Sequence, residues 1–156
     1  MSDQDFMRLA IERALDGVRR GQSPFGACIV KDGAVVSAAH NEVWARLDIT
    51  AHAEMCAIRQ ACQALQTIDL SGCVLYSTCE PCPMCFAACH WARIDKVVYG
   101  ARIQDAQAAG FSELMISNRE MKKWGGSRME IVGDFLRDEC VEVFRVWAEA
   151  GQSRPY

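Results

Sequence analysis

The sequence lacks the long apolar runs that mark membrane proteins. No stretch reaches the roughly 18 consecutive apolar residues that a transmembrane helix needs. The opening residues, MSDQDFMRLA, are acidic and already helical in pattern, so they do not resemble a secretory signal. Internal repeats and low-complexity segments are also missing. We therefore expect a single domain over residues 1–156 that has no association with a membrane.

An excess of basic residues is missing as well. The formal net charge is −3, whereas a nucleic-acid-binding surface normally shows as a strongly basic patch. The only basic cluster comprises Arg119, Lys122, Lys123 and Arg128, and such clusters are usually solvated surface. We therefore expect a small molecule, not a nucleic acid, as the partner.

The cysteines do not form the pattern of a secreted disulfide framework. There are nine, an odd number, and several lie in apolar, regular segments. Disulfide-rich secreted proteins are typically shorter and carry an even count. We interpret most of these thiols as small buried hydrophobic groups, and we expect the protein in the reducing cytoplasm.

Apolar periodicity and turn residues predict ten elements in the order α-β-β-α-β-α-β-α-β-α. Helices are expected over residues 3–20, 50–65, 81–92, 104–116 and 134–150, and strands over 26–31, 34–40, 72–77, 95–100 and 128–132. Asp32-Gly33 between two apolar runs predicts a hairpin, and residues 41–50 and 117–128 read as loops. The βαβ spacing after residue 72 indicates a partly parallel sheet, for which a three-layer α/β/α sandwich is the simplest packing.

Two motifs about 30 residues apart carry candidate metal ligands. His52-Ala53-Glu54 is followed by Pro81-Cys82-Pro83-Met84-Cys85, which together offer one imidazole and two thiolates. The two cysteines share one face of a predicted helix start, where the positive helix end favours thiolates. Structural zinc sites use four protein ligands, whereas hydrolytic sites use three and leave a position for water. The sequence therefore predicts one catalytic Zn²⁺ per chain, with Glu54 as the base that takes a proton from the water.

Alternatives exist for the same cysteines. Cys79 and Cys89 flank the pair, so a redox pair or a four-thiolate structural site is arithmetically possible. However, Cys89 lies about 10 Å above the start of the helix by the rise per residue, which is too far to share a small ion with Cys82. His90 has the same distance problem. A non-catalytic zinc-binding module would require a fourth ligand or the loss of Glu54.

Several segments resemble the cytidine deaminase superfamily of zinc-dependent enzymes. They are PFGACIV, TAHAEMCAIRQAC, LYSTCEPCPMCFAACHWARIDKVVYGA and DAQAAGF, and they look most like the branch of guanine and nucleoside deaminases. The resemblance implies a five-stranded mixed sheet with helices on both faces. It also implies hydrolytic deamination of a nucleobase or nucleoside, above all guanine to xanthine or guanosine to xanthosine, by a homodimer.

The resemblance implies the metal ligands and proton shuttle already named, and adds residues that contact substrate. Asn41 matches an asparagine that hydrogen-bonds the base, and an amide can both donate and accept. Phe25 and Trp91 match aromatic positions that pack on the base. The backbone N–H groups of Ala53 and Cys82 are expected to lie near the substrate.

Two further positions are specific to the guanine deaminase branch. Glu113 follows the DAQAAGF segment and matches a second acid near the leaving amino group. Tyr156 matches a C-terminal aromatic residue that closes over the active site, in some members by exchange between the two subunits of a dimer. Residues 151–156 are therefore expected to form a lid.

Part of the chain departs from that branch. The stretch MEIVGDFLRDECVEVF, Met129 to Phe144, resembles bacterial tRNA adenosine deaminases more closely. A tRNA adenosine-to-inosine deaminase is therefore one alternative, and a deaminase of cytosine, cytidine or a triazine is another. The sequence leaves open whether a free base or a nucleoside is the substrate.

Overall fold

The computed structural model describes residues 1–156 and contains seven helices and five strands. In chain order they are α1 (Asp3–Arg19), β1 (Gly26–Lys31), β2 (Ala34–His40), α2 (Val43–Arg46), α3 (Ala53–Leu65), β3 (Cys73–Cys79), α4 (Pro83–Trp91), β4 (Lys96–Ala101), α5 (Ile103–Ala108), α6 (Asn118–Gly125), β5 (Glu130–Val132) and α7 (Arg137–Glu149). None of the helices has both the length and the apolar character needed to cross a membrane.

The strands form one mixed sheet in the order β2-β1-β3-β4-β5. Strand β1 runs antiparallel to both β2 and β3, whereas β3, β4 and β5 are parallel. Asp32 and Gly33 join β1 to β2 with φ values of 50° and 75°, as expected for a hairpin turn with both central residues at positive φ. The predicted five-stranded mixed sheet is confirmed.

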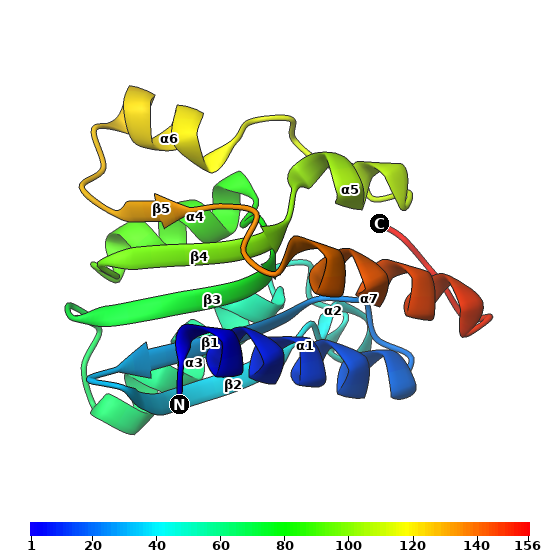
Figure 1. The fold of residues 1–156 in the computed structure, drawn as a ribbon, viewed down its shortest axis with the longest axis horizontal. Helices are drawn as coiled ribbons and strands as arrows, with labels where there is room; N and C mark the ends of the chain where they lie inside the picture. The colour runs from blue at the N-terminus through cyan, green and yellow to red at the C-terminus, as the bar shows by residue number, and fades with distance from the viewer.

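Helices cover both faces of this sheet, which confirms the predicted three-layer sandwich. Helices α1 and α7 pack on one face, and α3 and α4 lie on the other, with α6 beside α4 (Figure 1). Successive side chains of β1 point to opposite faces of the sheet and therefore enter different cores. Ile29 is buried in the core on the α3 and α4 side, and Cys28 in the core on the α1 side.

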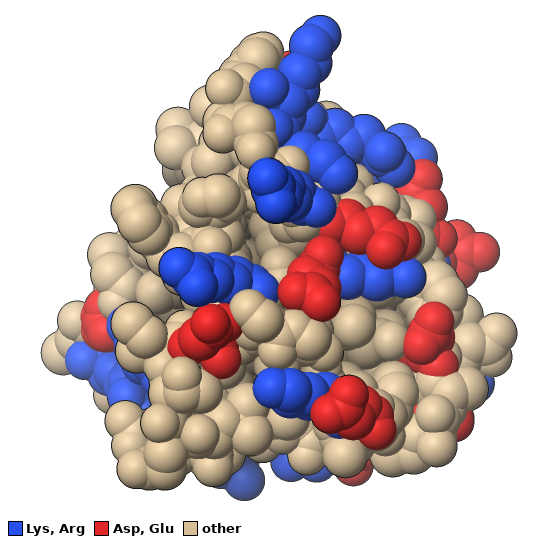
Figure 2. All heavy atoms as spheres, turned by 90° about the vertical axis from the view of Figure 1, so that its left-hand side faces the viewer, with Lys and Arg blue, Asp and Glu red and all other residues tan.

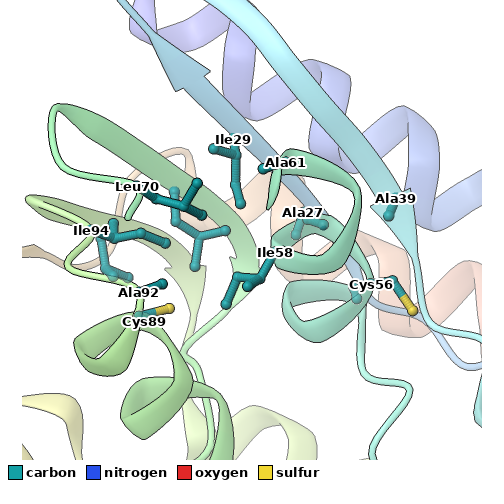
Figure 3. Close-up of a cluster of buried hydrophobic side chains, with 14 of the residues drawn as sticks. Ala27, Ile29, Ala39, Cys56, Ile58, Ala61, Leu70, Cys89, Ala92 and Ile94 are labelled. Atoms are coloured by element: carbon teal, nitrogen blue, oxygen red, sulfur yellow. The ribbon is translucent and has the colours of Figure 1, made fainter. Parts of the chain in front are cut away.

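The core under α3 and α4 fixes the two helices that carry the metal-ligand motifs. Ile58 of α3 and Cys89 of α4 are buried in one cluster with Leu70 and Ile94, which lie just before β3 and β4 (Figure 3). Because these contacts hold the bodies of both helices against the sheet, their N-terminal ends have little freedom to separate.

Three parts of the chain differ from the sequence-based prediction. The expected loop 41–50 contains the short helix α2, and the expected helix 104–116 is reduced to α5 because Gly110 has a φ of +110°. The expected loop 117–128 instead forms α6. Its start carries a capping box, in which the side chains of Ser117 and Glu120 each accept a backbone N–H of the other residue.

The cap expected for the last helix is also different. Helix α7 begins at Arg137, after Leu136 in a left-handed conformation. Asp134 does not cap it, because its carboxylate accepts hydrogen bonds from Arg102 at 2.7 and 2.6 Å. Asp134 therefore ties the end of β4 to the connection between β5 and α7.

Candidate active site

The three predicted metal ligands lie at the adjoining N-terminal ends of α3 and α4. His52 is the residue that precedes α3, and Cys82 the residue that precedes α4; both have extended backbones. Pro83 then occupies the first helical position of α4, where a missing N–H costs nothing. Cys85 follows in the first turn and is fully buried.

The ligand atoms are close enough to share one small ion. Nδ1 of His52 lies 3.6 Å from Sγ of Cys82 and 3.5 Å from Sγ of Cys85, and all three ligand atoms fall within 4.8 Å of one another. A tetrahedral zinc ion with bonds of about 2.0–2.3 Å separates its ligands by roughly 3.5 Å. The donor set and its spacing therefore fit zinc, and neither Cys79 nor Cys89 belongs to the group.

The electrostatics of the two cysteines favour a thiolate at the site. The hydrogen bond from Cys85, together with the imidazole of His52, lowers the pKa of Cys82 to about 4. The same hydrogen bond and burial raise the pKa of Cys85. A cation bound between the sulfurs would remove that remaining proton, since a metal-bound thiol is deprotonated.

Glu54 is the second residue of α3, in its first turn and two residues after His52. Its side chain is buried, with an exposed fraction of only 6%, and burial raises the pKa of its carboxyl group. The Ser77 hydroxyl is 3.4 Å from Oε1 but only 2.7 Å from the carbonyl oxygen of Cys79. The charge of His52 opposes the effect of burial on the Glu54 carboxyl group, so Glu54 lies beside the predicted metal ligands as a proton shuttle requires.

A pocket opens onto these residues and is completed by the segment after α5. The pocket has a volume of about 280 Å³ and is walled by His52 and Cys82 on one side and by Phe111 and Glu113 on the other. Burial, followed by the nearby charges of Cys82 and Glu54, raises the pKa of Glu113 to about 7. The predicted acid after DAQAAGF is therefore brought to the pocket wall.

Below this pocket lies a cavity about the size of one water molecule. Its volume is about 20 Å³, and a water needs a space of about 10–15 Å³ or more. Glu54, Glu80 and Glu113 line it together with His52. Three carboxyl groups are expected around so small a cavity only where they exchange protons, or where main-chain N–H groups stabilise their negative charge.

Aromatic side chains form the apolar side of the site. Phe25 lines the small cavity, and its ring centroid lies 5.0 Å from that of Phe111 in an edge-to-face arrangement. Phe111 in turn contacts Tyr156 edge-to-face at 5.1 Å. Phe25 is thus placed as expected, and Phe111 is an additional pocket residue that the sequence motif contained but that had no assigned role.

Asn41 is fully buried where β2 ends. Its Oδ1 accepts a hydrogen bond from the N–H of Val43 at 3.0 Å, and its Nδ2 donates to the hydroxyl of Tyr156 at 2.7 Å. The side-chain amide therefore keeps one lone pair on Oδ1 and one N–H on Nδ2 that these two bonds do not use. Asn41 lines neither the pocket nor the small cavity, and it is joined to the site through the hydroxyl of Tyr156; its contact with a base stays a prediction.

The C-terminal segment folds back over the pocket of its own chain. Ser112 N–H donates to the carbonyl oxygen of Tyr156 at 2.8 Å, and the Tyr156 ring lies 5.8 Å from that of His52. Upstream, Trp44 Nε1 donates to the carbonyl oxygen of Arg154 at 3.0 Å, and the Arg154 guanidinium lies 4.2 Å from the centre of the Trp44 ring. This contact of Trp44 was not predicted from the sequence, because it joins residues more than a hundred positions apart.

Ala53 and Trp91, the remaining predicted site residues, lie at opposite ends of their helices relative to the pocket. Ala53 is the first residue of α3, where N–H groups have no partner within the helix; its expected contact with the substrate stays a prediction. Trp91 is 82% exposed at the opposite end of α4, roughly 13 Å from Cys82 by the helical rise. The structure does not bring Trp91 to the pocket, and its assignment as a base-contacting residue has no support within one chain.

Known proteins of similar sequence include zinc-dependent deaminases. Residues 1–101 match the family model described as the cytidine and deoxycytidylate deaminase zinc-binding region. The chain is 40% identical to guanine deaminase of Bacillus subtilis (strain 168) over 100% of both sequences. It is 46% identical to the tRNA-specific adenosine deaminase of Aquifex aeolicus (strain VF5), but over only 65% of this chain and 67% of that one.

A solved structure gives the same result for the fold. The structure of guanine deaminase from Nitrosomonas europaea matches with a TM-score of 0.86 and 26% identity, over 95% of this chain and 85% of that one. The family match covers more than half of the chain and contains every ligand of the His and Cys cluster as well as Glu54. The protein therefore belongs to the cytidine and deoxycytidylate deaminase family and is a hydrolytic deaminase.

Proposed function

We propose that this protein converts guanine and water to xanthine and ammonia. The observation that carries the proposal is the pair of carboxyl groups, Glu54 and Glu113, that line one water-sized cavity beside the predicted metal ligands. The full-length similarity to a guanine deaminase supports the same substrate. Guanine carries its amino group on C2, between two ring nitrogens, so its deamination has use for two proton carriers.

The predicted ligands His52, Cys82 and Cys85 would hold one zinc ion per chain. Bound zinc supplies a Lewis acid that lowers the pKa of water to about 7. Glu54 accepts a proton from the attacking water and delivers it to the ring nitrogen next to C2. A new C2–O bond forms as the ring double bond shifts onto that nitrogen.

Glu113 acts on the leaving group. The amino nitrogen on C2 must gain one proton before the C–N bond breaks and ammonia departs, and the added hydroxyl must lose one for the carbonyl of xanthine to form. A carboxyl group with a pKa of about 7 can accept and donate protons with similar ease at neutral pH. Glu113 therefore carries that proton from the oxygen to the nitrogen.

The rest of the pocket orients a flat, polar base. Phe25 and Phe111 supply apolar walls, and Asn41 offers an unused N–H and lone pair to the ring edge. Tyr156 closes the site from above and excludes water, so residues 151–156 serve as the lid. The backbone N–H groups of Ala53 and Cys82 complete the polar lining.

The function is tested by measuring ammonia release from the zinc-loaded protein. Guanine, guanosine, cytosine, cytidine, a triazine, adenine and adenosine are supplied in parallel. We expect the largest kcat/KM with guanine, or with guanosine if ribose is accommodated. Turnover confined to the pyrimidines or the triazine would contradict the proposal and identify a deaminase of cytosine, cytidine or a triazine instead.

The second candidate function is deamination of adenosine in tRNA, and one surface favours it. Arg119, Lys122, Lys123 and Arg128 lie on or just after α6 and have no carboxylate within ion-pair distance, although nine other basic residues are paired. Figure 2 shows Lys and Arg gathered at the top of the face on which α6 lies. A tRNA anticodon hairpin is therefore included in the assay, and activity on the hairpin alone would establish this function instead.

Removal of the lid gives a prediction of its own. Deleting residues 152–156 removes Tyr156 together with its bonds to Asn41 and Ser112. We expect kcat/KM for guanine to fall by about 10²-fold, since loss of closure admits water and releases the positioned groups. Tyr156→Phe, which keeps the ring but removes the hydroxyl, should lower kcat/KM by only about 3- to 10-fold, the worth of one hydrogen bond.

The control for the truncation and for Tyr156→Phe is Ser153→Ala. Ser153 is exposed, and its side chain makes none of the hydrogen bonds that hold the C-terminal segment. Zinc content should remain at one per chain in all three variants. An unchanged rate in the truncated protein would remove the lid from the mechanism.

We propose that the protein is a homodimer, because Leu47, Ile49 and Leu114 are exposed apolar side chains, and two of them line the mouth of the pocket; such patches often mark interfaces. Sedimentation equilibrium that gave only monomer would exclude it. We also propose a cytoplasmic location, which suits nine free cysteines; recovery of the protein in a secreted fraction would contradict it.

A further inference from the structure

Glu80 is a buried carboxylate whose oxygens are both used by main-chain donors. Its exposed fraction is 6%. Oε1 accepts a hydrogen bond from the N–H of Ile103 at 3.3 Å, and Oε2 accepts one from the N–H of Asn118 at 2.9 Å. Ile103 and Asn118 are the first residues of α5 and α6. One side chain therefore caps two helices, each of which presents unpaired N–H groups and a positive end.

The main chain of Glu80 and Pro81 makes further hydrogen bonds near the starts of α5 and α6. The N–H of Glu80 donates to the carbonyl oxygen of Ala101 at 2.8 Å, just before α5. The side chain of Asn118 donates from Nδ2 to the carbonyl oxygen of Pro81 at 2.7 Å. The loop Glu80-Pro81, which leads directly into the metal ligand Cys82, is thus fastened to both ends of the segment 103–118.

The segment between these two attachment points carries Glu113. Residues 109–117 have no helix or strand of their own, so local structure does little to fix the Glu113 side chain. The bonds of Glu80 and Asn118 hold residues 103 and 118, which lie on either side of this stretch, against the ligand loop. Because Glu80 and Glu113 also line the same small cavity, the attachment acts close to the reacting atoms.

Asn118 supports a role beyond stability. It is fully buried, yet its Oδ1 has no hydrogen-bond partner, and an unpaired buried polar atom costs free energy. A position kept only for packing would be expected to avoid that cost. The amide is instead held where its other end reaches the carbonyl of Pro81.

We propose that Glu80 is a positioning residue that sets where Glu113 stands relative to the metal-ligand loop. The proposal rests on the proposed function, because it assumes that Glu113 handles a proton in the reaction. Glu80 has no assigned step in the reaction, and both of its oxygens accept main-chain hydrogen bonds. It acts through Glu113 by fixing the ends of segment 103–118.

The test is a double-mutant cycle with Glu80→Gln and Glu113→Gln, assayed for ammonia release from guanine. Glutamine is the same size but presents an NH₂ group to one of the two N–H donors, so one cap is lost. We expect Glu80→Gln to lower kcat by about 10²-fold, as a displacement of about 1 Å can do, with KM changed less than about threefold and zinc still at one per chain. In the Glu113→Gln background, Glu80→Gln should lower kcat less than about threefold further, because residues that act as one unit are not additive.

The matched control is Glu120→Ala, which removes the side-chain acceptor for the N–H of Ser117 in the capping box of α6 but does not touch the ligand loop; it should leave kcat within about twofold. Asn118→Ala, which removes only the bond to Pro81, provides a second variant should Glu80→Gln fold poorly, and it should reproduce the same non-additivity. Amide hydrogen exchange supplies a readout without substrate: the N–H groups of Ile103 and Asn118 should exchange faster in Glu80→Gln.

The possible outcomes distinguish failure of the proposed function from failure of the positioning role of Glu80. If guanine is not turned over, the proposed function fails, and the same cycle is run on whichever substrate releases ammonia. If Glu113→Gln alone has no effect on kcat, the role of Glu113 fails. If Glu113→Gln lowers kcat but Glu80→Gln leaves it unchanged, or lowers it by the same factor in both backgrounds, the positioning role of Glu80 is overturned.

Discussion

Glutamine in place of Glu54 is expected to lower kcat for ammonia release by about 10³-fold or more while zinc stays at one per chain. The amide has the same shape but can neither take a proton from water nor return it to the ring, and a positioned general acid–base group contributes about 10²–10⁴-fold. Glu54 is buried in the first turn of α3 and lines the small cavity. Of the other two carboxyl groups there, Glu80 is held by two N–H groups, and Glu113 is assigned to the leaving group.

Ser77→Ala is the control for Glu54. The Ser77 hydroxyl is 3.4 Å from Oε1 of Glu54, but it makes its shorter bond, at 2.7 Å, to the carbonyl oxygen of Cys79. Its loss should therefore change kcat by less than about fivefold. Zinc is measured by elemental analysis in each variant. If Glu54→Gln kept a tenth or more of the wild-type kcat, the proton-shuttle assignment would be wrong.

The first two strands were predictable to the residue, whereas α5 and α6 were not. Gly26–Lys31 and Ala34–His40 are apolar runs bounded by a Gly on one side and joined by Asp32-Gly33, so local sequence determines both ends. Helix α6 lies in a polar stretch that includes Gly125-Gly126, and this composition favoured a loop over a helix. Its start depends on the Ser117–Glu120 capping box, which is visible in the sequence, and on Glu80, which lies 38 residues away and is not.

The metal cluster was also predictable, because its information is local. Spacing places Cys82 and Cys85 on one helix face, and only their meeting with His52 requires the fold. Long-range pairs had no such signal: Asn41 and Tyr156 meet across 115 positions, and only a family resemblance suggested that both serve one site. Trp91 shows the limit of that resemblance, because a matching residue type at the exposed end of α4 does not reach a pocket at its other end.

Serine in place of Cys85 is expected to remove both zinc and activity. Cys85 is fully buried and is one of only three ligand atoms in the cluster, and a serine hydroxyl is a poor zinc ligand at neutral pH compared with a thiolate. After dialysis we expect less than about 0.1 zinc per chain, and ammonia release no greater than that of the buffer. A chelator that strips zinc from the wild-type protein should give the same loss, and added Zn²⁺ should restore the rate in the wild type alone.

Cys89→Ala decides whether the ion is catalytic or structural. Cys89 lies one turn beyond Cys85 in α4, is fully buried in the core shared with α3 (Figure 3), and is outside the ligand cluster. If the site has three protein ligands, Cys89→Ala keeps one zinc per chain and a kcat within about threefold of wild type, although the cavity costs about 1 kcal/mol or more of stability. Loss of zinc in this variant would mean that a fourth thiolate completes the coordination. No ligand position would then remain for water, and a hydrolytic reaction at this metal would be excluded.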